Sequence, residues 1–171
     1  MARQSQEHLV SSDSTDLSPQ IDHDELIAIF ERIVHWSDSP TSRRAMMAAI
    51  DFPVDDVSIF LVVNQLVYRG AMHPKDLADS LGMGRPNISK LSARAVELGL
   101  VVRVAHSSDD RSILLALSES GRAIGAKITN LLRSGLMDLL DSWDPSEVIQ
   151  FEKLLKKYIT QVEAKYPITK K

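Results

Sequence analysis

One short segment of the chain constrains the fold more than any other, because it combines two brief helical patterns with two strand patterns. Pro74 opens a first helix, which Gly82 ends, and Pro86 opens a second, since proline suits the first turn of a helix. Two runs of β-branched and aliphatic residues follow at 101–104 and 112–117, with a polar loop between them. This order of helix, helix and two-stranded ribbon predicts a winged helix-turn-helix.

The second short helix has two unlike faces. Ile88, Leu91 and Ala95 recur at helical spacing, so we expect them to face the core. The opposite face is polar, and its small residues Ser89 and Ala93 would let the backbone settle deep in a DNA major groove. Its donor side chains are of the kind that contact base edges or phosphates, although a mixed polar face is also typical of a solvated helix. The predicted DNA-binding residues on this helix are Arg85, Pro86, Asn87, Ser89, Lys90 and Arg94.

The polar loop of the ribbon, predicted over residues 106–111, supports the same interpretation. It is made of small and acidic residues around His106, with Arg111 at its far end. A guanidinium on a protruding loop can enter a narrow minor groove, so Arg111 is a further candidate for DNA binding. We expect Asp109 to brace the loop and Arg103 to support the wing. The alternative is an ordinary surface ion pair, worth about 0–1 kcal/mol.

The rest of the chain predicts helices around this segment. Residues 1–20 are polar and predict a mobile arm, and residues 21–52 predict a helical region that can break at Pro40. The winged domain is expected over 53–117 and begins with an almost wholly apolar helix, which is typical of a buried position. Residues 118–171 predict two further amphipathic helices, with wide apolar stripes.

Composition excludes several classes of function. The chain has no cysteine, which excludes disulfides, Cys-ligated zinc and thiol nucleophiles. Its five histidines are scattered, so we expect no metal site, although His23 and Asp24 could join a distant ligand. Neither a Gly-rich phosphate loop nor a nucleophile elbow is present, so we expect neither an enzyme nor a cofactor. The longest apolar runs, 45–50 and 59–63, fall far short of the ~18 residues of a membrane span. We therefore expect a soluble, cytoplasmic protein.

The charge is distributed unevenly. The formal net charge is −3 at pH 7, which taken alone argues against a nucleic-acid partner. Residues 69–112, however, carry seven basic and five acidic side chains, so the negative charge lies in the rest of the chain. A module that binds only proteins has no reason to keep basic residues on one helix face and at the ribbon, so this distribution favours DNA.

A set of short motifs makes the chain similar to a known family. In order and spacing these motifs resemble the MarR family of bacterial transcriptional regulators, with Ser118 where that family usually has Thr. Gly84 stands at a helix cap where the family usually has Ser or Thr, so a side-chain cap is absent there. The motifs are Leu81-Gly82, Ile88–Leu98, Gly99-Leu100-Val101, Arg103, Asp109-Asp110-Arg111 and Leu117-Ser118-Glu119-Ser120-Gly121.

The resemblance implies a homodimer in which the first helix and the last two helices form the dimer contact. It implies that the helix beginning near residue 85 enters the major groove and that Arg111 enters the minor groove. It also implies release from DNA by a small aromatic or phenolic effector bound between the dimer helices and the winged domain. Met and aromatic side chains adapt to such ligands, although they are equally typical of a core. The candidate effector-binding residues are His35, Trp36, Arg43, Met46, Met47 and Phe60.

The sequence therefore predicts a mainly α protein with a small β-hairpin wing, a winged helix-turn-helix flanked by N- and C-terminal dimerisation helices. The predicted function is that of a sequence-specific regulator that binds double-stranded DNA as a homodimer and represses transcription at a pseudo-palindromic operator. The alternative is a winged-helix module that binds other proteins without specific DNA binding.

Overall fold

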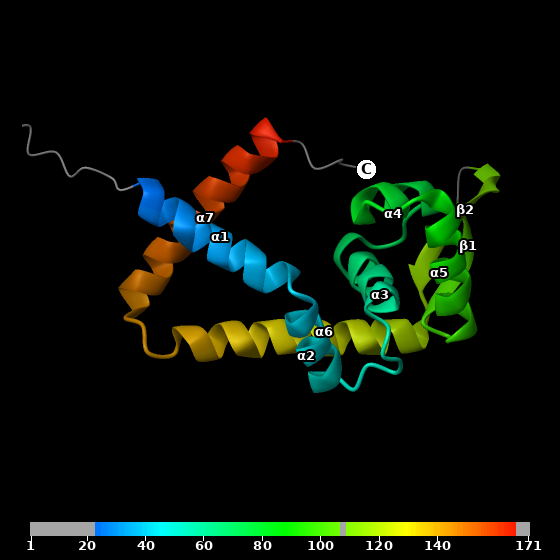
Figure 1. Ribbon diagram of the computed structural model, residues 1–171, viewed down its shortest axis with the longest axis horizontal. Coiled ribbons are helices and arrows are strands. Elements are labelled where there is room, and N and C mark those ends of the chain that lie inside the picture. Colours follow the sequence, from blue (N-terminus) through cyan, green and yellow to red (C-terminus); the bar gives the residue numbers. More distant parts are fainter. Residues whose placement is uncertain (1–22, 107–108, 167–171) are drawn as a thin grey trace, which may run out of the picture. The chain divides into compact units, whose positions relative to one another are not determined.

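The computed structural model describes residues 23–106 and 109–166, with only the backbone described for residues 106 and 109–112. The described chain is mainly helical with one small ribbon, as predicted (Figure 1). Its elements are α1 (His23–Asp38), α2 (Pro40–Ala49), α3 (Val57–Arg69), α4 (Pro74–Leu81), α5 (Arg85–Glu97), β1 (Val101–His106), β2 (Asp109–Leu117), α6 (Glu119–Leu140) and α7 (Pro145–Lys165).

The chain divides into two compact units between Asp38 and Ser39, and the described part of the first unit is α1. The helix break expected at Pro40 is confirmed. The Ser39 hydroxyl caps α2 by accepting a hydrogen bond from the backbone N–H of Thr41 at 3.2 Å, and Pro40 occupies the first helical position. The arm predicted over residues 1–20 lies outside the described residues.

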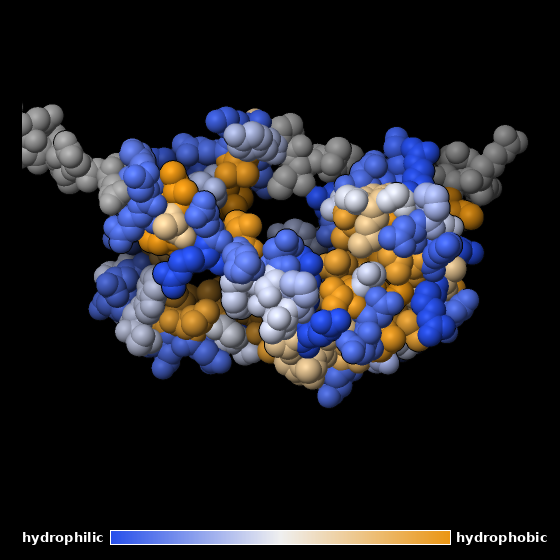
Figure 2. Space-filling view, in the orientation of Figure 1, coloured by the Kyte–Doolittle hydropathy of each residue, from blue (hydrophilic) through white to orange (hydrophobic). Residues whose placement is uncertain are grey.

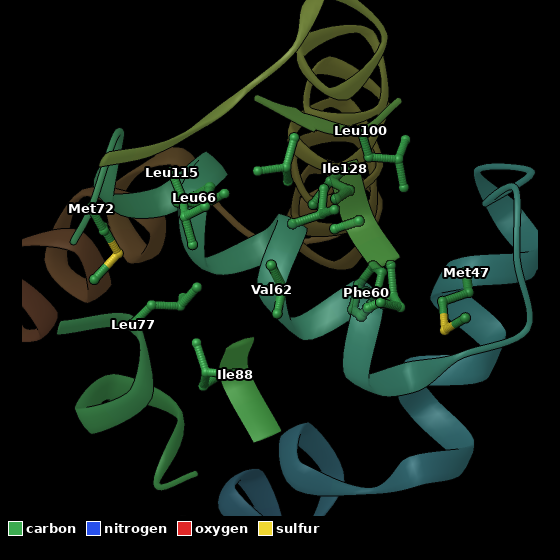
Figure 3. Packing of buried hydrophobic residues seen from close by; sticks show 14 of the residues in the cluster. Met47, Phe60, Val62, Leu66, Met72, Leu77, Ile88, Leu100, Leu115 and Ile128 are labelled. Atoms are coloured by element: carbon green, nitrogen blue, oxygen red, sulfur yellow. The ribbon is translucent and has the colours of Figure 1, made fainter. Parts of the chain in front are cut away.

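Helix α3 is the centre of the second unit. It packs against α2, α4, α5, α6 and β2, which explains why it is apolar on nearly every side. Figure 3 shows Phe60, Val62 and Leu66 of this helix among buried side chains from the surrounding elements. Phe60 also meets Phe52 edge to face, with ring centroids 5.4 Å apart. The buried residues of α3 are Ile59, Phe60, Val62, Val63 and Leu66.

The turn between α4 and α5 is formed as the sequence predicts. Gly82 ends α4 in the left-handed conformation, with φ of 61°, where a residue without a Cβ atom is favoured. The backbone N–H of Met83 then donates to the carbonyl of Ala78 at 3.0 Å. Leu77 and Ala78 anchor α4 in the core, so the turn delivers the chain directly into α5.

The wing is an antiparallel ribbon that is longer than predicted. Pairing runs from Val101 opposite Leu117 to His106 opposite Asp109, with an irregularity next to Ala105. The predicted loop over 106–111 is therefore wrong in extent, because ladder hydrogen bonds join backbone groups and continue through polar residues. Residues 109–111, Arg111 included, belong to β2.

A third backbone segment joins this ribbon on the β2 side. Met72 and Leu115 exchange two hydrogen bonds, with N···O distances of 3.0 and 2.8 Å. Both side chains are buried, so the link between α3 and α4 is fixed to the root of the wing.

Two regions of the second unit leave large apolar side chains exposed, although its core is closed. The first half of α6 buries Gly121, Gly125 and Ile128, whereas the second half buries no residue and reaches the core only through the partly exposed Leu131. Helix α7 buries none of its residues. Exposed apolar surface is coloured orange in Figure 2. The exposed large apolar residues of these two helices are Leu132, Leu136, Met137, Leu139, Ile149, Phe151, Leu154, Leu155, Tyr158 and Ile159.

The first unit shows the same property on its own. Helix α1 has no buried residue and exposes Leu26, Ile29, Ile33 and Trp36, among others. Among the helices of residues 23–106 and 109–166, none combines the length and apolar character needed to cross a membrane.

Candidate nucleic-acid interface

Helix α5 is anchored by one face, as the sequence predicts. Ile88 and Ala95 are buried, and Leu91 and Leu98 pack against the same core from partly exposed positions. Ser92 joins this face with only 3% of its surface exposed. Sequence reasoning missed Ser92, because a serine carries no apolar signal even where its position on the helix is internal.

The opposite face of α5 projects from the unit. Arg85, Pro86, Asn87, Ser89 and Lys90 are all exposed, so the structure brings five of the predicted DNA-binding residues together on one surface. Within the described residues, no carboxylate pairs with Arg85 or Lys90. Both positive charges are therefore available to an external anion.

Two of the polar side chains predicted to bind DNA, Arg94 and Asn87, make local contacts. Arg94 is exposed and forms an ion pair with Glu97 one turn later, with Nη1 and Oε2 3.4 Å apart. Asn87 donates through Nδ2 to the sulfur of Met83 at 3.7 Å. Sulfur is a weak acceptor, so a stronger acceptor such as a base edge can replace it. Asn87 thus remains suited to bind a base, whereas Arg94 is partly neutralised.

The start of α5 has the open cap that the sequence predicts. Gly84 occupies the cap position in an extended conformation, and no side chain caps the helix. The backbone N–H groups of Asn87 and Ile88 both donate to the carbonyl of Gly84, at 3.0 and 3.1 Å. The first turn is therefore held by backbone bonds alone, directly beside the exposed residues Arg85 and Pro86.

The wing places its candidate residues on two paired strands. Arg103 lies on β1 opposite Leu115, and its side chain is exposed. Asp109 and Arg111 lie on β2, but their side chains are outside the described part of the structure. The bracing of the wing by Asp109 and the minor-groove role of Arg111 stay predictions.

The candidate effector-binding residues occupy different environments. Met47 and Phe60 are buried core residues, and Met46 packs against the same core. Arg43 on α2 is partly exposed. His35 and Trp36 lie on α1, in the other unit, where both are exposed. An effector-binding role for these side chains stays a prediction. The described residues contain no cluster of three His, Asp or Glu side chains able to hold a metal ion.

At the base of the wing, the structure gives a role to residues that the sequence analysis noted only as part of a motif. Ser118 caps α6, and its hydroxyl accepts from the backbone N–H of Gly121 at 2.9 Å while donating to the carbonyl of Gly99. Arg122 donates to the carbonyl of Leu117 at 3.1 Å. The end of α5, the ribbon and the start of α6 therefore meet at one point.

Comparison with known sequences gives a limited match. No protein-family model matches the chain. A helix-turn-helix-type transcriptional regulator of Mycobacterium tuberculosis is 36% identical over 75 residues, which are 44% of this chain and 48% of that protein. The match thus spans about half the length of this curated relative.

Comparison with solved structures covers most of the chain. A MarR family protein from Bacillus stearothermophilus superimposes with a TM-score of 0.66 and 19% identity, over 83% of this chain and 99% of that one. A transcriptional regulator of Thermotoga maritima gives 0.63 and 16%, over 85% and 99%. A mutant of MarR from E. coli gives 0.54 and 23%, over 83% and 99%. These likenesses confirm the fold: the chain has the winged-helix fold of MarR family structures.

Proposed function

We propose that this chain, which has the fold of MarR family structures, is a transcription regulator that binds double-stranded DNA sequence-specifically as a homodimer. The observation that carries the proposal is the exposed face of α5, where Arg85 and Lys90 have no carboxylate partner among the described residues. The major groove is wide enough to admit an α-helix, and a helix anchored on one side can present its other side to the base pairs there.

The residues of this face suit distinct parts of DNA recognition. Arg85 and Lys90 can hold phosphates or guanine edges, and Asn87 can bind adenine through its amide. Ser89 is small and exposed, so it allows the helix backbone to approach the base pairs closely. In this proposal Arg111 of β2 contacts the adjacent minor groove.

Dimer formation is supported by the exposed apolar surfaces of α6, α7 and α1. Helices that each expose this many large apolar side chains are uncommon on monomers and mark interaction surfaces. Leu155 on α7 and Leu139 on α6, for example, are 46% and 73% exposed. A two-fold dimer then predicts a pseudo-palindromic operator, with half-sites one helical turn apart, ~10 bp.

We further propose that the bound dimer represses transcription and that a small aromatic or phenolic effector releases it. Within the second unit, Arg43 of α2 is partly exposed and can meet an anionic group, and Met46 of the same helix can adapt to an aromatic ring. A screen of aromatic acids for release of bound operator tests this step. A failure to find a releasing compound would contradict effector control and would leave DNA binding intact.

The first experiment is selection of bound fragments from the host genome by the full-length protein. We expect a preferred pseudo-palindromic fragment, bound with a log–log salt slope of about −0.9 per phosphate neutralised. The absence of any preferred fragment at moderate salt would favour the protein-binding alternative.

Point variants then test the assigned surface. We expect Asn87→Ala to lower discrimination at the contacted base pair, a loss of about 1–3 kcal/mol, because bidentate base contacts carry sequence preference. Lys90→Ala should weaken binding and lower the salt slope by about one phosphate if it contacts the backbone. Lys153→Ala is the matched control, because it removes an exposed lysine from α7. Equal operator binding by all three variants would show that the surface has been assigned wrongly.

A further inference from the structure

We propose that Ser118 and Gly121 form a clamp that fixes the orientation of the DNA-binding elements on α6 and thereby sets the half-site spacing that the dimer accepts. The proposal rests on the proposed function. The clamp comprises Ser118 and Gly121 at the start of α6, together with the backbone of Gly99 and Leu100 that they contact.

The Ser118 side chain joins two elements that are far apart in the sequence. Its hydroxyl donates to the carbonyl of Gly99, at the end of α5, and accepts from the backbone N–H of Gly121 at 2.9 Å. The backbone N–H of Ser118 also donates to the carbonyl of Leu100 at 3.0 Å. One serine therefore caps α6 and ties that cap to the end of α5.

Gly121 completes the clamp because nothing larger fits. A Cβ atom at this position would lie 2.0 Å from the carbonyl oxygen of Leu100, a fixed backbone atom, and 3.3 Å from the Leu117 side chain. An alanine would force α6 and Leu100 to separate by about 1 Å to reach even the shortest separation that real Cβ atoms show, 3.0 Å. The absence of a side chain lets α6 seat directly on the chain between α5 and β1.

All parts of the winged domain that are proposed to contact DNA converge on this point. Leu100 follows α5 and precedes β1, and its backbone N–H donates to the carbonyl of Ala95 at 3.0 Å. Val101 pairs with Leu117, the last residue of β2, immediately before Ser118. A change at the clamp therefore moves α5 and the wing together with respect to α6.

The far half of α6 carries part of the proposed dimer surface. The helix runs unbroken from Glu119 to Leu140, 22 residues, or about 33 Å at 1.5 Å per residue. A tilt of about 10° at the clamp would displace the far end by about 6 Å, nearly two base-pair steps of 3.4 Å. A small loss of rigidity at the clamp is thus large enough to relax the spacing between two recognition helices.

The test measures affinity for the selected operator and for duplexes with one or two base pairs added or removed between the half-sites. Wild-type protein should lose more than about tenfold in affinity when the spacing changes, as for one mismatched base pair. Ser118→Ala should bind the native spacing up to about tenfold more weakly, the cost of about one mismatched base pair, because the DNA-binding elements are no longer held in the orientation that this spacing requires. On each duplex of altered spacing, the affinity of Ser118→Ala should be close to that of wild type on the same duplex, so the variant discriminates less between spacings.

Two variants separate positioning from stability. Ser118→Thr keeps a hydroxyl and should restore the wild-type spacing profile. Gly121→Ala should flatten the profile, whereas Ser120→Ala should not, because Ser120 is an exposed neighbour in the first turn of the same helix. If Gly121→Ala fails to fold, the comparison of Ser118→Ala with Ser118→Thr still decides the question.

The outcomes distinguish this proposal from the function on which it rests. Uniform weakening of Ser118→Ala on every duplex, matching a smaller folded fraction, would overturn the positioning role while DNA binding stands. Failure of the wild-type protein to select any operator would overturn the proposed function itself. A flattened profile that Ser118→Thr rescues supports the clamp.

Discussion

At the scale of single residues, helical periodicity predicts which side of α5 is buried but not every side chain on it. Ile88 and Ala95 are buried as their spacing predicts, and Lys90 is exposed. Ser92 is the exception: it is buried, and its hydroxyl has no hydrogen-bond partner in the described part of the chain. Helical spacing from Ile88 and Ala95 places position 92 on the buried face, but the polar side chain of Ser92 masks that signal.

The unpartnered hydroxyl gives a prediction for stability. We expect Ser92→Ala to raise the free energy of unfolding by about 1 kcal/mol, because it removes an unsatisfied buried polar group and improves helix propensity. Chemical denaturation at fixed protein concentration measures the change. Ser89→Ala, on the exposed face of the same helix, is the control and should change stability by only about 0.5 kcal/mol or less. A loss of stability in Ser92→Ala alone would show that this hydroxyl has a partner in solution.

At the scale of secondary-structure elements, helix boundaries follow from capping residues, whereas the extent of the ribbon does not. Asp144 and Pro145 predict the start of α7 correctly, because a cap is a local interaction. The ribbon extends past its predicted ends at the loop, where the polar residues His106 and Asp109 pair through their backbone. The clamp at Ser118 was visible only as part of a motif, because Gly99 and Ser118 meet through tertiary structure.

The cap of α7 predicts a pH dependence. The Asp144 carboxylate accepts hydrogen bonds from the side chain and backbone N–H of Ser146, and these bonds lower its pKa below the ordinary value of 3.8. The Glu147 carboxylate completes a capping box by accepting from the backbone N–H of Asp144 at 3.0 Å. Because the folded-state pKa is lowered, this stabilisation is complete above 3.8 and is lost as the pH falls through the lowered value.

Circular dichroism can measure this effect as helix content during an acid titration. Asp144→Asn keeps a cap that cannot titrate, so the helix content of wild type and variant should converge as the pH falls below 3.8. A second carboxylate on α7 also titrates in this range, because a hydrogen bond from Lys156 and its positive charge lower the pKa of Glu152. The variant Glu152→Gln measures the contribution of Glu152, which is then subtracted from the titration. A constant difference between wild type and Asp144→Asn across the titration would contradict the assignment.

At the scale of the whole molecule, the order of elements predicts the winged fold, and the wide stripes on the last two helices predict a partner. The structure explains the width: the first half of α6 uses its apolar residues in the core, for example Ile128. The second half of α6 and all of α7 have apolar residues without a place in that core. In the proposed dimer, a second copy of the chain covers this apolar surface.

Dimerisation can be tested by placing charge on this surface. We expect Leu155→Glu, at the centre of the apolar stripe of α7, to weaken the dimer at least about 100-fold, because it buries an unpaired carboxylate in an apolar contact. Gln150→Glu adds the same charge to the polar face of α7 and should leave the dimer intact. Sedimentation at micromolar concentration measures both variants. A wild-type monomer under these conditions would contradict the dimer.

The link between Met72 and Leu115 has a consequence for how the protein behaves when concentrated. An unprotected strand edge invites pairing with another molecule and starts aggregation. Met72 occupies the outer edge of β2 at Leu115. The outer edge of β1 is only six residues long, carries the charge of Arg103 and is irregular next to Ala105. Short length, charge and irregularity all discourage intermolecular sheets. The ribbon can therefore project from the unit as a wing without seeding fibrils.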